Sequence, residues 1–233
     1  MQELDSHIQS VGAAPGIEHD EIVSLPGGAG SARVTCIDYC LDQVSIQEIN
    51  DLDDFTSRHR PAWTRVRWIN VDGLADTQAI QTLARKYDLH PLSVEDMLHE
   101  GQRPKVEPYG GEESDHQARL FIVTQAMDLV EGRLRNEQVS IFLGHSTVLT
   151  FQATRSTEWD PLRQRIKLKG SRLRKSDASF LAYSLLDALI DHCFPILEAF
   201  SERAEELEAL ILERSQPELL GQIHQFKRDL LLL

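Results

Sequence analysis

The sequence has little of what marks secreted and membrane-embedded proteins. Its three cysteines, Cys36, Cys40 and Cys193, are an odd and low number for 233 residues, which speaks against a disulfide framework and indicates a reducing compartment. Residues 1–16 are mostly polar or small and lack the apolar core of a signal peptide. No continuous apolar run reaches the roughly 18 residues that a membrane-spanning helix needs, so we expect this stretch of chain to be soluble.

Basic residues are also scarce, because 24 Lys and Arg stand against 37 Asp and Glu, for a net charge of −13. This balance argues against a nucleic-acid partner and favours the attraction of cations. An anionic lipid or a nucleic-acid backbone could bind the basic run over residues 163–175, but we interpret that run as an offset to acidic helices. A hydrophobic fraction of 41% is ordinary for a globular protein long enough to bury a core.

Motifs of common enzymes are missing as well. The chain has no Gly-rich phosphate loop, no Gly-x-Ser-x-Gly and no His-Glu-x-x-His. A zinc site at Cys36 and Cys40 would need two further ligands, and no Cys/His pair of suitable spacing follows. One enzyme hypothesis stays open, a soluble α/β enzyme with Glu95 and Asp96 as an acid/base pair. Adjacent helix residues point in different directions, and no nucleophile accompanies them, which weakens that hypothesis.

Patterns of apolar residues predict a mixed α/β fold. Strands are expected at residues 32–39, 43–49, 64–71, 105–109, 119–127, 138–143 and 147–153, and helices at 51–59, 76–87, from Pro91 and at 159–168. Their irregular alternation predicts a mixed β-sheet with helices on both faces, an αβα sandwich. We expect a disordered tail over residues 1–17 and the α/β domain over residues 18–175.

The character of the sequence changes at residue 176. Residues 178–213 contain no Gly and a single Pro, Pro195, and apolar residues recur through them at helical spacing. A helix of that length spans about 50 Å, so part of it should pack on a neighbouring helix. Pro217 suits the first turn of that second helix. Residues 176–233 are therefore predicted to form two long antiparallel helices, the first of them rich in acidic residues.

Residues 90–109 are the most informative part of the chain. Pro91 fits the first turn of a helix, and Pro104 follows its end. The adjacent carboxylates Glu95 and Asp96 belong to this short helix. Carboxylate oxygens are the ligands that a divalent cation such as Mg²⁺ prefers, so the pair is a candidate metal site. Acids near a helix N-terminus can also serve the helix dipole alone, and that interpretation stays open at this point.

The segment reads His-Pro-Leu-Ser-Val-Glu-Asp-Met-Leu, followed after a spacer by Gln-Arg-Pro-Lys-Val-Glu. It strongly resembles the cytoplasmic domain of CorA-type magnesium/cobalt transporters, whose pattern is close to His-Pro-Leu-x-x-Glu-Asp-x-Leu and Gln-Arg-Pro-Lys-x-Glu. Further matching segments follow in the family's order, at residues 136–144 with 147–152, 180–191 with 194–198, and 224–230. The resemblance covers the chain from about residue 30 to its end.

The resemblance implies a metal-sensing part of a homopentameric membrane transporter of divalent cations, and not an enzyme. In the family, the carboxylate that matches Asp96 faces the adjacent subunit and meets a carboxylate of a stalk helix, which lies beyond residue 233. The residue that matches Glu95 shares a second metal position with the residue that matches Asp187. Asp191, one helical turn further on, is a fourth candidate ligand. Mg²⁺ is the expected cation, with Co²⁺ or Ca²⁺ as alternatives at the same sites, and bound Mg²⁺ holds the subunits in a closed arrangement.

The resemblance also implies a place in the cell, on the cytoplasmic side of the cell inner membrane. Residues 229–233 end inside an apolar helical pattern, so we expect a fragment that stops before the membrane segments and their Gly-Met-Asn pore signature. Without the stalk carboxylate, metal sites in this fragment should be weak. Two alternatives remain, a zinc transporter of the same architecture and, from another class, a non-catalytic helical interaction module.

Overall fold

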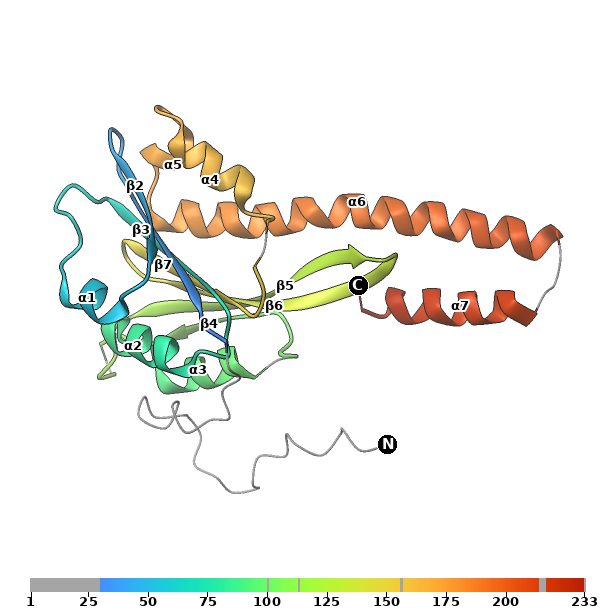
Figure 1. The fold of residues 1–233 in the computed structure, drawn as a ribbon, viewed down its shortest axis with the longest axis horizontal. Helices are drawn as coiled ribbons and strands as arrows, with labels where there is room; N and C mark the ends of the chain where they lie inside the picture. Colours follow the sequence, from blue (N-terminus) through green and yellow to red (C-terminus); the bar gives the residue numbers. More distant parts are fainter. Residues whose placement is uncertain (1–29, 100, 113, 156, 214–216, 233) are drawn as a thin grey trace, which may run out of the picture.

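The computed structural model describes residues 30–232 apart from residues 100, 113, 156 and 214–216. Within them, a seven-stranded sheet carries helices on both of its faces, and two further lengths of helix extend past the sheet (Figure 1). The αβα sandwich expected from the sequence is therefore confirmed. The tail predicted over residues 1–17 lies outside the described residues.

The sheet is mixed, with a single parallel contact at its centre. Its strands are β1 (Arg33–Tyr39), β2 (Val44–Ile49), β3 (Val66–Asp72), β4 (Lys105–Tyr109), β5 (Arg119–Val130), β6 (Arg133–Leu143) and β7 (Thr147–Gln152). They lie in the order β2-β1-β3-β7-β6-β5-β4, and neighbours are antiparallel except β3 and β7, which run parallel. The hairpin expected between the strands at 138–143 and 147–153 is confirmed as the β6–β7 pair.

Helices cover the two faces of the sheet separately. The elements are α1 (Leu52–Ser57), α2 (Thr77–Tyr87), α3 (Pro91–Leu98), α4 (Asp160–Lys167), α5 (Arg172–Lys175), α6 (Ala178–Glu213) and α7 (Pro217–Leu230). On one side, here called the α3 face, apolar residues of α2 and α3 pack on Phe121, Phe142 and Phe151. On the other side, the α6 face, α4, α5 and the first turns of α6 pack on Trp68 and Ile141 (Figure 1).

Cap chemistry explains why α2 forms where the sequence predicts it. Asp76 precedes the helix, and its Oδ1 accepts the N–H of Ala79 at 3.0 Å. Its other oxygen accepts the N–H of Ala32 at 3.0 Å and so ties the helix start to the beginning of β1. Asp88 ends the helix in the left-handed conformation, with φ of 49°. A capping carboxylate contributes about 1 kcal/mol, so Asp76 stabilises the α3 face.

The β5–β6 hairpin is longer than the sequence pattern indicated. The strands were expected at 119–127 and 138–143, whereas the structure extends them to Val130 and back from Arg133. Glu131 and Gly132 form a two-residue turn with φ of 52° and 74°, which matches the twist of antiparallel strands. The added residues are mostly polar, because the tip of the hairpin projects past the rest of the sheet (Figure 1). A half-solvated tip shows no clear alternation, so both strands were predicted but their extension to the tip was missed.

The long helix α6 begins on the sheet, and its far half lies beside the second helix, α7. Its first turns bury Leu181, Leu185 and Leu189 against the α6 face. Further along, Ile196 and Phe200 contact the tip of the β5–β6 hairpin. α7 runs back alongside α6, as expected for an antiparallel pair (Figure 1). The division at residue 176 into an α/β domain and a helical pair stays a prediction, since the start of α6 belongs to the core of the sheet.

Part of α6 is apolar and long enough to cross a membrane by length and composition alone, over Ala178–Leu212. Among the described residues it is the one helix of this kind. A third of its most apolar window is buried inside the structure, at 33%. Core helices pass the same test, and the first turns of α6 are core, so this finding is weak support for a membrane span.

Candidate metal site

The helix α3 presents the Glu95–Asp96 pair at the edge of the α3 face. His90 precedes the helix, and its Nδ1 accepts the N–H of Leu92 at 3.2 Å. Val94 and Met97 are fully buried against the sheet, whereas Glu95 and Asp96 are half-buried at the other side of the helix. The apolar spacing thus fixes the rotation of α3 and leaves the carboxylate pair accessible.

Asp96 is held by a lysine of the neighbouring strand. Nζ of Lys105 donates to Oδ2 of Asp96 at 2.5 Å and lies 3.0 Å from Oε2 of Glu107. Burial alone would lower the pKa of Lys105, but the hydrogen bonds to Asp96 and Glu107 outweigh it and raise that pKa. The lysine therefore stays charged and compensates both carboxylates. A metal ion that binds Asp96 has to displace this ammonium group or share the carboxylate with it.

Gln138 closes the C-terminal end of α3, a role that the sequence did not reveal. Its Nε2 donates to the carbonyl oxygens of Asp96 at 3.2 Å and Met97 at 3.3 Å. Its Oε1 accepts the N–H of Gln102 at 3.1 Å. The last carbonyls of a helix have no partner within the helix, so this amide satisfies groups that would otherwise stay unpaired. The available signal was a polar residue at the start of the largely apolar segment 138–143, and it was overlooked.

Asp187 and Asp191 lie on α6, on the opposite side of the sheet from α3 (Figure 1). Asp187 is half-buried and accepts a hydrogen bond from the hydroxyl of Tyr183 at 3.3 Å, and Asp191 is exposed. The structure therefore does not bring Asp187 or Asp191 to the Glu95–Asp96 pair within one chain. Across the described residues, no three or more His, Cys, Asp or Glu side chains are grouped as a metal cluster.

The donor set nevertheless suits the cation that the sequence implies. Glu95, Asp96, Asp187 and Asp191 offer carboxylate oxygens, and Mg²⁺ is commonly held by one or two carboxylates while it keeps several waters. Within one chain these carboxylates lie in two pairs, one on each side of the sheet.

The cysteines give no support to a zinc site in this part of the chain. All three are free, and Cys36 is buried on the α3 face. Burial raises the pKa of the Cys36 thiol to about 12, with a further contribution from the negative charge of Asp38. Zinc binds the thiolate form, so this cysteine is a poor ligand at neutral pH. The interpretation of Cys36 as a structural thiol agrees with its burial.

Two histidines meet at the start of α3. The ring of His90 lies 5.1 Å from that of His116 and 5.0 Å from that of Tyr109, measured between centroids. Nδ1 of His116 is 2.8 Å from Oδ1 of Asp88. Burial lowers the pKa of His90 from the ordinary 6.5, and the charge of His116 lowers it further. His90 caps α3 as an acceptor, so its protonation removes the cap.

This cap predicts an acid-sensitive start of α3. Because the folded pKa of His90 lies below 6.5, its contribution to stability is complete above pH 6.5 and is lost as pH falls through the folded value. His90→Asn retains a capping oxygen but does not titrate. We expect urea unfolding of the parent to show a larger loss of stability between pH 7.5 and pH 5.5 than unfolding of the variant, by up to about 1 kcal/mol.

His145→Asn is the matched control for this prediction. His145 lies in the exposed turn between β6 and β7 and caps no helix. The pH dependence of unfolding of the His145→Asn variant should follow that of the parent. Equal pH dependence in the parent and in His90→Asn would contradict the capping role.

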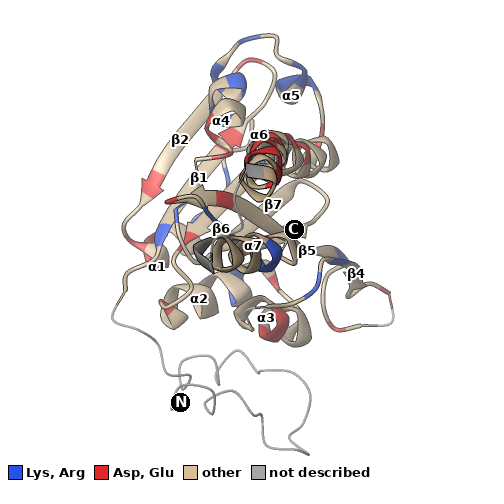
Figure 2. Ribbon diagram, turned by 90° about the vertical axis from the view of Figure 1, so that its right-hand side faces the viewer, with Lys and Arg blue, Asp and Glu red and all other residues tan. Residues whose placement is uncertain are grey.

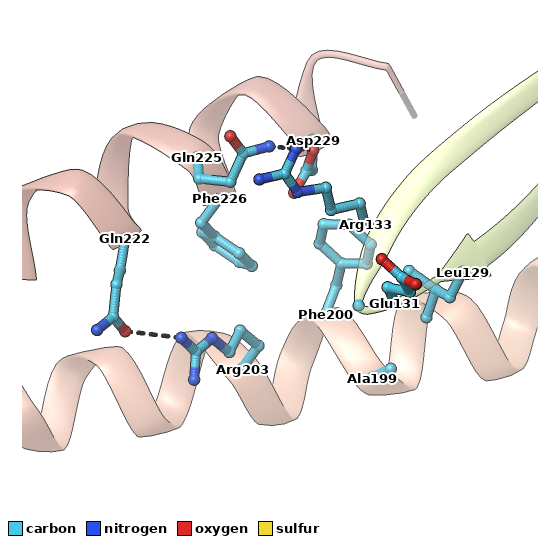
Figure 3. A pocket seen from close by; sticks show the side chains of 11 residues that line it. Leu129, Glu131, Arg133, Ala199, Phe200, Arg203, Gln222, Gln225, Phe226 and Asp229 are labelled. Carbon is cyan, nitrogen blue, oxygen red and sulfur yellow. Dashed lines mark hydrogen bonds between the residues drawn. The ribbon is translucent and has the colours of Figure 1, made fainter.

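A cavity between the tip of the β5–β6 hairpin and the two long helices lies away from all four candidate ligands. It has a volume of about 500 Å³ and is enclosed by the hairpin tip, α6 and α7 (Figure 3). Phe200 and Phe226 line it, and Arg203 donates to Oε1 of Gln222 at 2.7 Å across the two helices. Gln225, Phe226 and Asp229 of the matching segment at residues 224–230 line this cavity, but none of the four candidate ligands does.

Comparison with known proteins identifies the family. Residues 63–233 match the family described as CorA-like Mg²⁺ transporter protein. The chain is 37% identical over 165 residues to the cobalt/magnesium transport protein CorA of Thermotoga maritima, covering 70% of this chain and 45% of that protein. It is 28% identical over 164 residues to the putative metal ion transporter YfjQ of Bacillus subtilis, with 70% and 48% covered. The chain thus spans about half the length of these curated relatives.

Solved structures share the fold. The soluble domain of CorA from Methanocaldococcus jannaschii superposes with a TM-score of 0.62 at 19% identity, over 85% of this chain and 72% of that one. The cytoplasmic domain of ZntB from Vibrio parahaemolyticus gives a TM-score of 0.58 at 11% identity, over 76% and 66%. At these identities the likeness concerns the fold alone. The family match over residues 63–233 decides the assignment: this chain belongs to the CorA-like Mg²⁺ transporter family.

Proposed function

We propose that this chain is the metal-sensing and gating part of a divalent cation transporter that carries Mg²⁺ and Co²⁺. The observation that carries the proposal is the position of Asp96. It lies half-exposed at the edge of α3, and its carboxylate is compensated by a side chain that can be displaced, Lys105. The cobalt/magnesium transport protein to which the chain is 37% identical supports the choice of cation.

The proposed mechanism requires a second subunit. Glu95 and Asp96 lie on the α3 face, whereas Asp187 and Asp191 lie on α6, so one chain cannot place them around a single ion. In a homopentamer, the α3 edge of one subunit meets carboxylates of its neighbour, and Mg²⁺ neutralises the acids that face each other. When internal Mg²⁺ falls, these acids repel, and the subunits move toward an open arrangement. The assembly lies at the cytoplasmic side of the membrane.

The charge distribution fits the handling of cations. Acidic residues mark α6, whereas basic residues gather on α4 and α5 (Figure 2). In the proposed assembly, the negative potential of α6 raises the local concentration of divalent cations and speeds their arrival. The protein does no covalent chemistry in this scheme.

Thermal melts test the proposal directly. Binding stabilises the folded chain by about 1 kcal/mol at a few times Kd. For a protein of this size, that stabilisation raises the melting temperature by about 2–4 °C. We expect this shift in 20 mM Mg²⁺, Co²⁺ or Ca²⁺ against NaCl of equal ionic strength, and a smaller one in Asp96→Asn.

Two outcomes would count against the proposal. Divalent cations could raise the melting temperature of the parent and of the double variant Asp96→Asn/Asp187→Asn by the same amount. That result would show that these two acids are not ligands. Micromolar Zn²⁺ binding that vanishes in Cys36→Ser with Cys40→Ser would favour the zinc alternative instead.

A further inference from the structure

One face of the β5–β6 hairpin touches both α3 and the α6–α7 pair. Side chains of a strand alternate between faces, and directly opposed residues of two strands share a face. The opposed pairs Gln125–Gln138, Met127–Asn136 and Leu129–Leu134 are every second pair along the hairpin, so they lie on one face. These six residues are called the ribbon face below.

At its root, the ribbon face holds the end of α3. Gln138 bonds the carbonyl oxygens of Asp96 and Met97 and the N–H of Gln102, as described above. Its cross-strand neighbour Gln125 donates from Nε2 to the carbonyl oxygen of Gln102 at 3.1 Å. The two amides together fix the last turn of α3 and the segment that leads from it to β4. Gln138 is only 8% exposed, so these bonds are shielded from water.

At its tip, the ribbon face contacts α6 and α7. Leu134 forms a buried cluster with Ile196 and Phe200 of α6, against which Met127, Leu129 and Phe226 of α7 pack. Asn136 donates from Nδ2 to the carbonyl oxygen of Leu232, just after the end of α7. Two-stranded ribbons twist strongly, which turns the same face from α3 toward the helix pair.

The two contact regions are close and their connection is short. Gln138 and Leu134 are four residues apart on one strand, which is about 13 Å in extended backbone. α3 and α6 otherwise lie on opposite faces of the sheet (Figure 1). At the tip, the cavity of about 500 Å³ separates part of the hairpin from the helices (Figure 3). A few side chains therefore carry the contact, and α7 has room to shift.

We propose that Gln138 is a positioning residue for Asp96, and that the ribbon face couples the end of α3 to α7. A change in what Asp96 binds moves the last turn of α3, Gln138 follows its carbonyl bonds, and the tip passes the displacement to Phe226. The regulatory meaning rests on the proposed function of Asp96, but the coupling itself does not. The ribbon face supplies a route by which metal at the α3 edge alters the helices beyond the sheet.

The coupling is tested without metal in the 233-residue chain. Lys105→Met removes the ammonium that holds Asp96 and so loosens the end of α3. Amide hydrogen exchange of α7 around Phe226 should then be faster by about threefold, at the low end of what packed networks transmit. In a Gln138→Leu background, Lys105→Met should change that exchange no further, because the link to α3 is already broken.

Two further variants make the test specific. Ser140→Ala changes another buried polar residue of β6, two positions from Gln138, whose hydroxyl has no partner among the described atoms. The Lys105→Met effect on α7 should persist in this background. Gln125→Leu loses only the bond to Gln102, and it replaces Gln138→Leu if that variant does not fold. It should reduce the Lys105→Met effect on α7. An unchanged effect in the Gln138→Leu or Gln125→Leu background would overturn the coupling.

A Mg²⁺ titration separates this inference from the proposed function. If both hold, Mg²⁺ slows exchange around Phe226 in the parent, and Gln138→Leu abolishes that response while Ser140→Ala retains it. A response that depends on Asp96 but survives Gln138→Leu would overturn the coupling and leave the proposed function standing. A parent without any response that depends on Asp96, together with an intact Lys105→Met effect on α7, would overturn the proposed function and retain the coupling.

Discussion

Asp38→Ala should destabilise the protein by about 3–5 kcal/mol, the usual result of breaking a buried ion pair from one side. Arg67 donates from Nε and Nη2 to the two oxygens of Asp38 at 2.8 and 2.7 Å. The two side chains are 7% and 4% exposed. Burial alone would lower the pKa of Arg67, but the hydrogen bonds to Asp38 outweigh it and keep the guanidinium charged. The variant therefore leaves a buried positive charge without its carboxylate partner.

Urea unfolding of three further variants checks this result. Asp38→Ala combined with Arg67→Met removes both charges and should recover most of the lost stability. Glu48→Ala breaks the pair with Arg33, whose side chains are 40% and 48% exposed, and should cost at most about 1 kcal/mol. A loss near 1 kcal/mol for Asp38→Ala, or a double variant as unstable as the single one, would show that the pair does not carry this energy.

The ion pair also shows what sequence patterns convey about this sheet. Asp38 and Arg67 are directly opposed on β1 and β3, and Phe55 of α1 covers the guanidinium at 5.3 Å from its ring centroid. In the sequence, both residues look like solvated positions of half-buried strands. Their pairing depends on the register between β1 and β3, and the two residues are 29 positions apart in the sequence. The local alternation of polar and apolar residues does not specify this register.

Elements with local causes were predictable. Asp76 before α2, and Pro91 at the start of α3, are cap signals that act within one helical turn, and the structure confirms both helices. The absence of Gly over residues 178–213 indicated one long helix, and α6 has those bounds. By contrast, the hairpin tip around Glu131 was missed, since a Glu-Gly turn is a weaker signal than Asn-Gly.

The candidate site also has a part that could be predicted from the sequence and a part that could not. The oxygen chemistry of Glu95 and Asp96 could be read from one short segment, because the helix holds both at its edge. The partners of Asp96 could not, since Lys105 comes from β4 and Gln138 from β6 through tertiary contacts. Asp187 was linked to Glu95 by resemblance to the family alone. Because the sheet lies between α3 and α6, Glu95 and Asp187 do not meet within one chain.

The second large effect is expected at Asp96 in an intact transporter that contains this chain. Asp96→Ala should leave the unfolding of the 233-residue chain within about 1 kcal/mol of the parent, because a partly exposed ion pair contributes little. In the mechanism proposed above, the same change removes the repulsion between facing carboxylates at low Mg²⁺ and also the ligand that lets Mg²⁺ hold the closed state. The Mg²⁺ concentration that protects the closed state from protease should rise about tenfold, within the usual range of coupling between sites.

Glu107→Ala is the matched control, because Glu107 contacts the same Lys105 at 3.0 Å but lies on β4 and not on α3. Its Mg²⁺ curves for protease protection and for inhibition of transport should follow those of the parent. Adding Asp187→Ala to Asp96→Ala should weaken the response further if both acids act on one gate. The charge of Asp96 would then matter far more for regulation than for folding, as a sensor requires. Curves of Asp96→Ala that overlay those of the parent would exclude Asp96 as the sensor, whatever the stability of the variant.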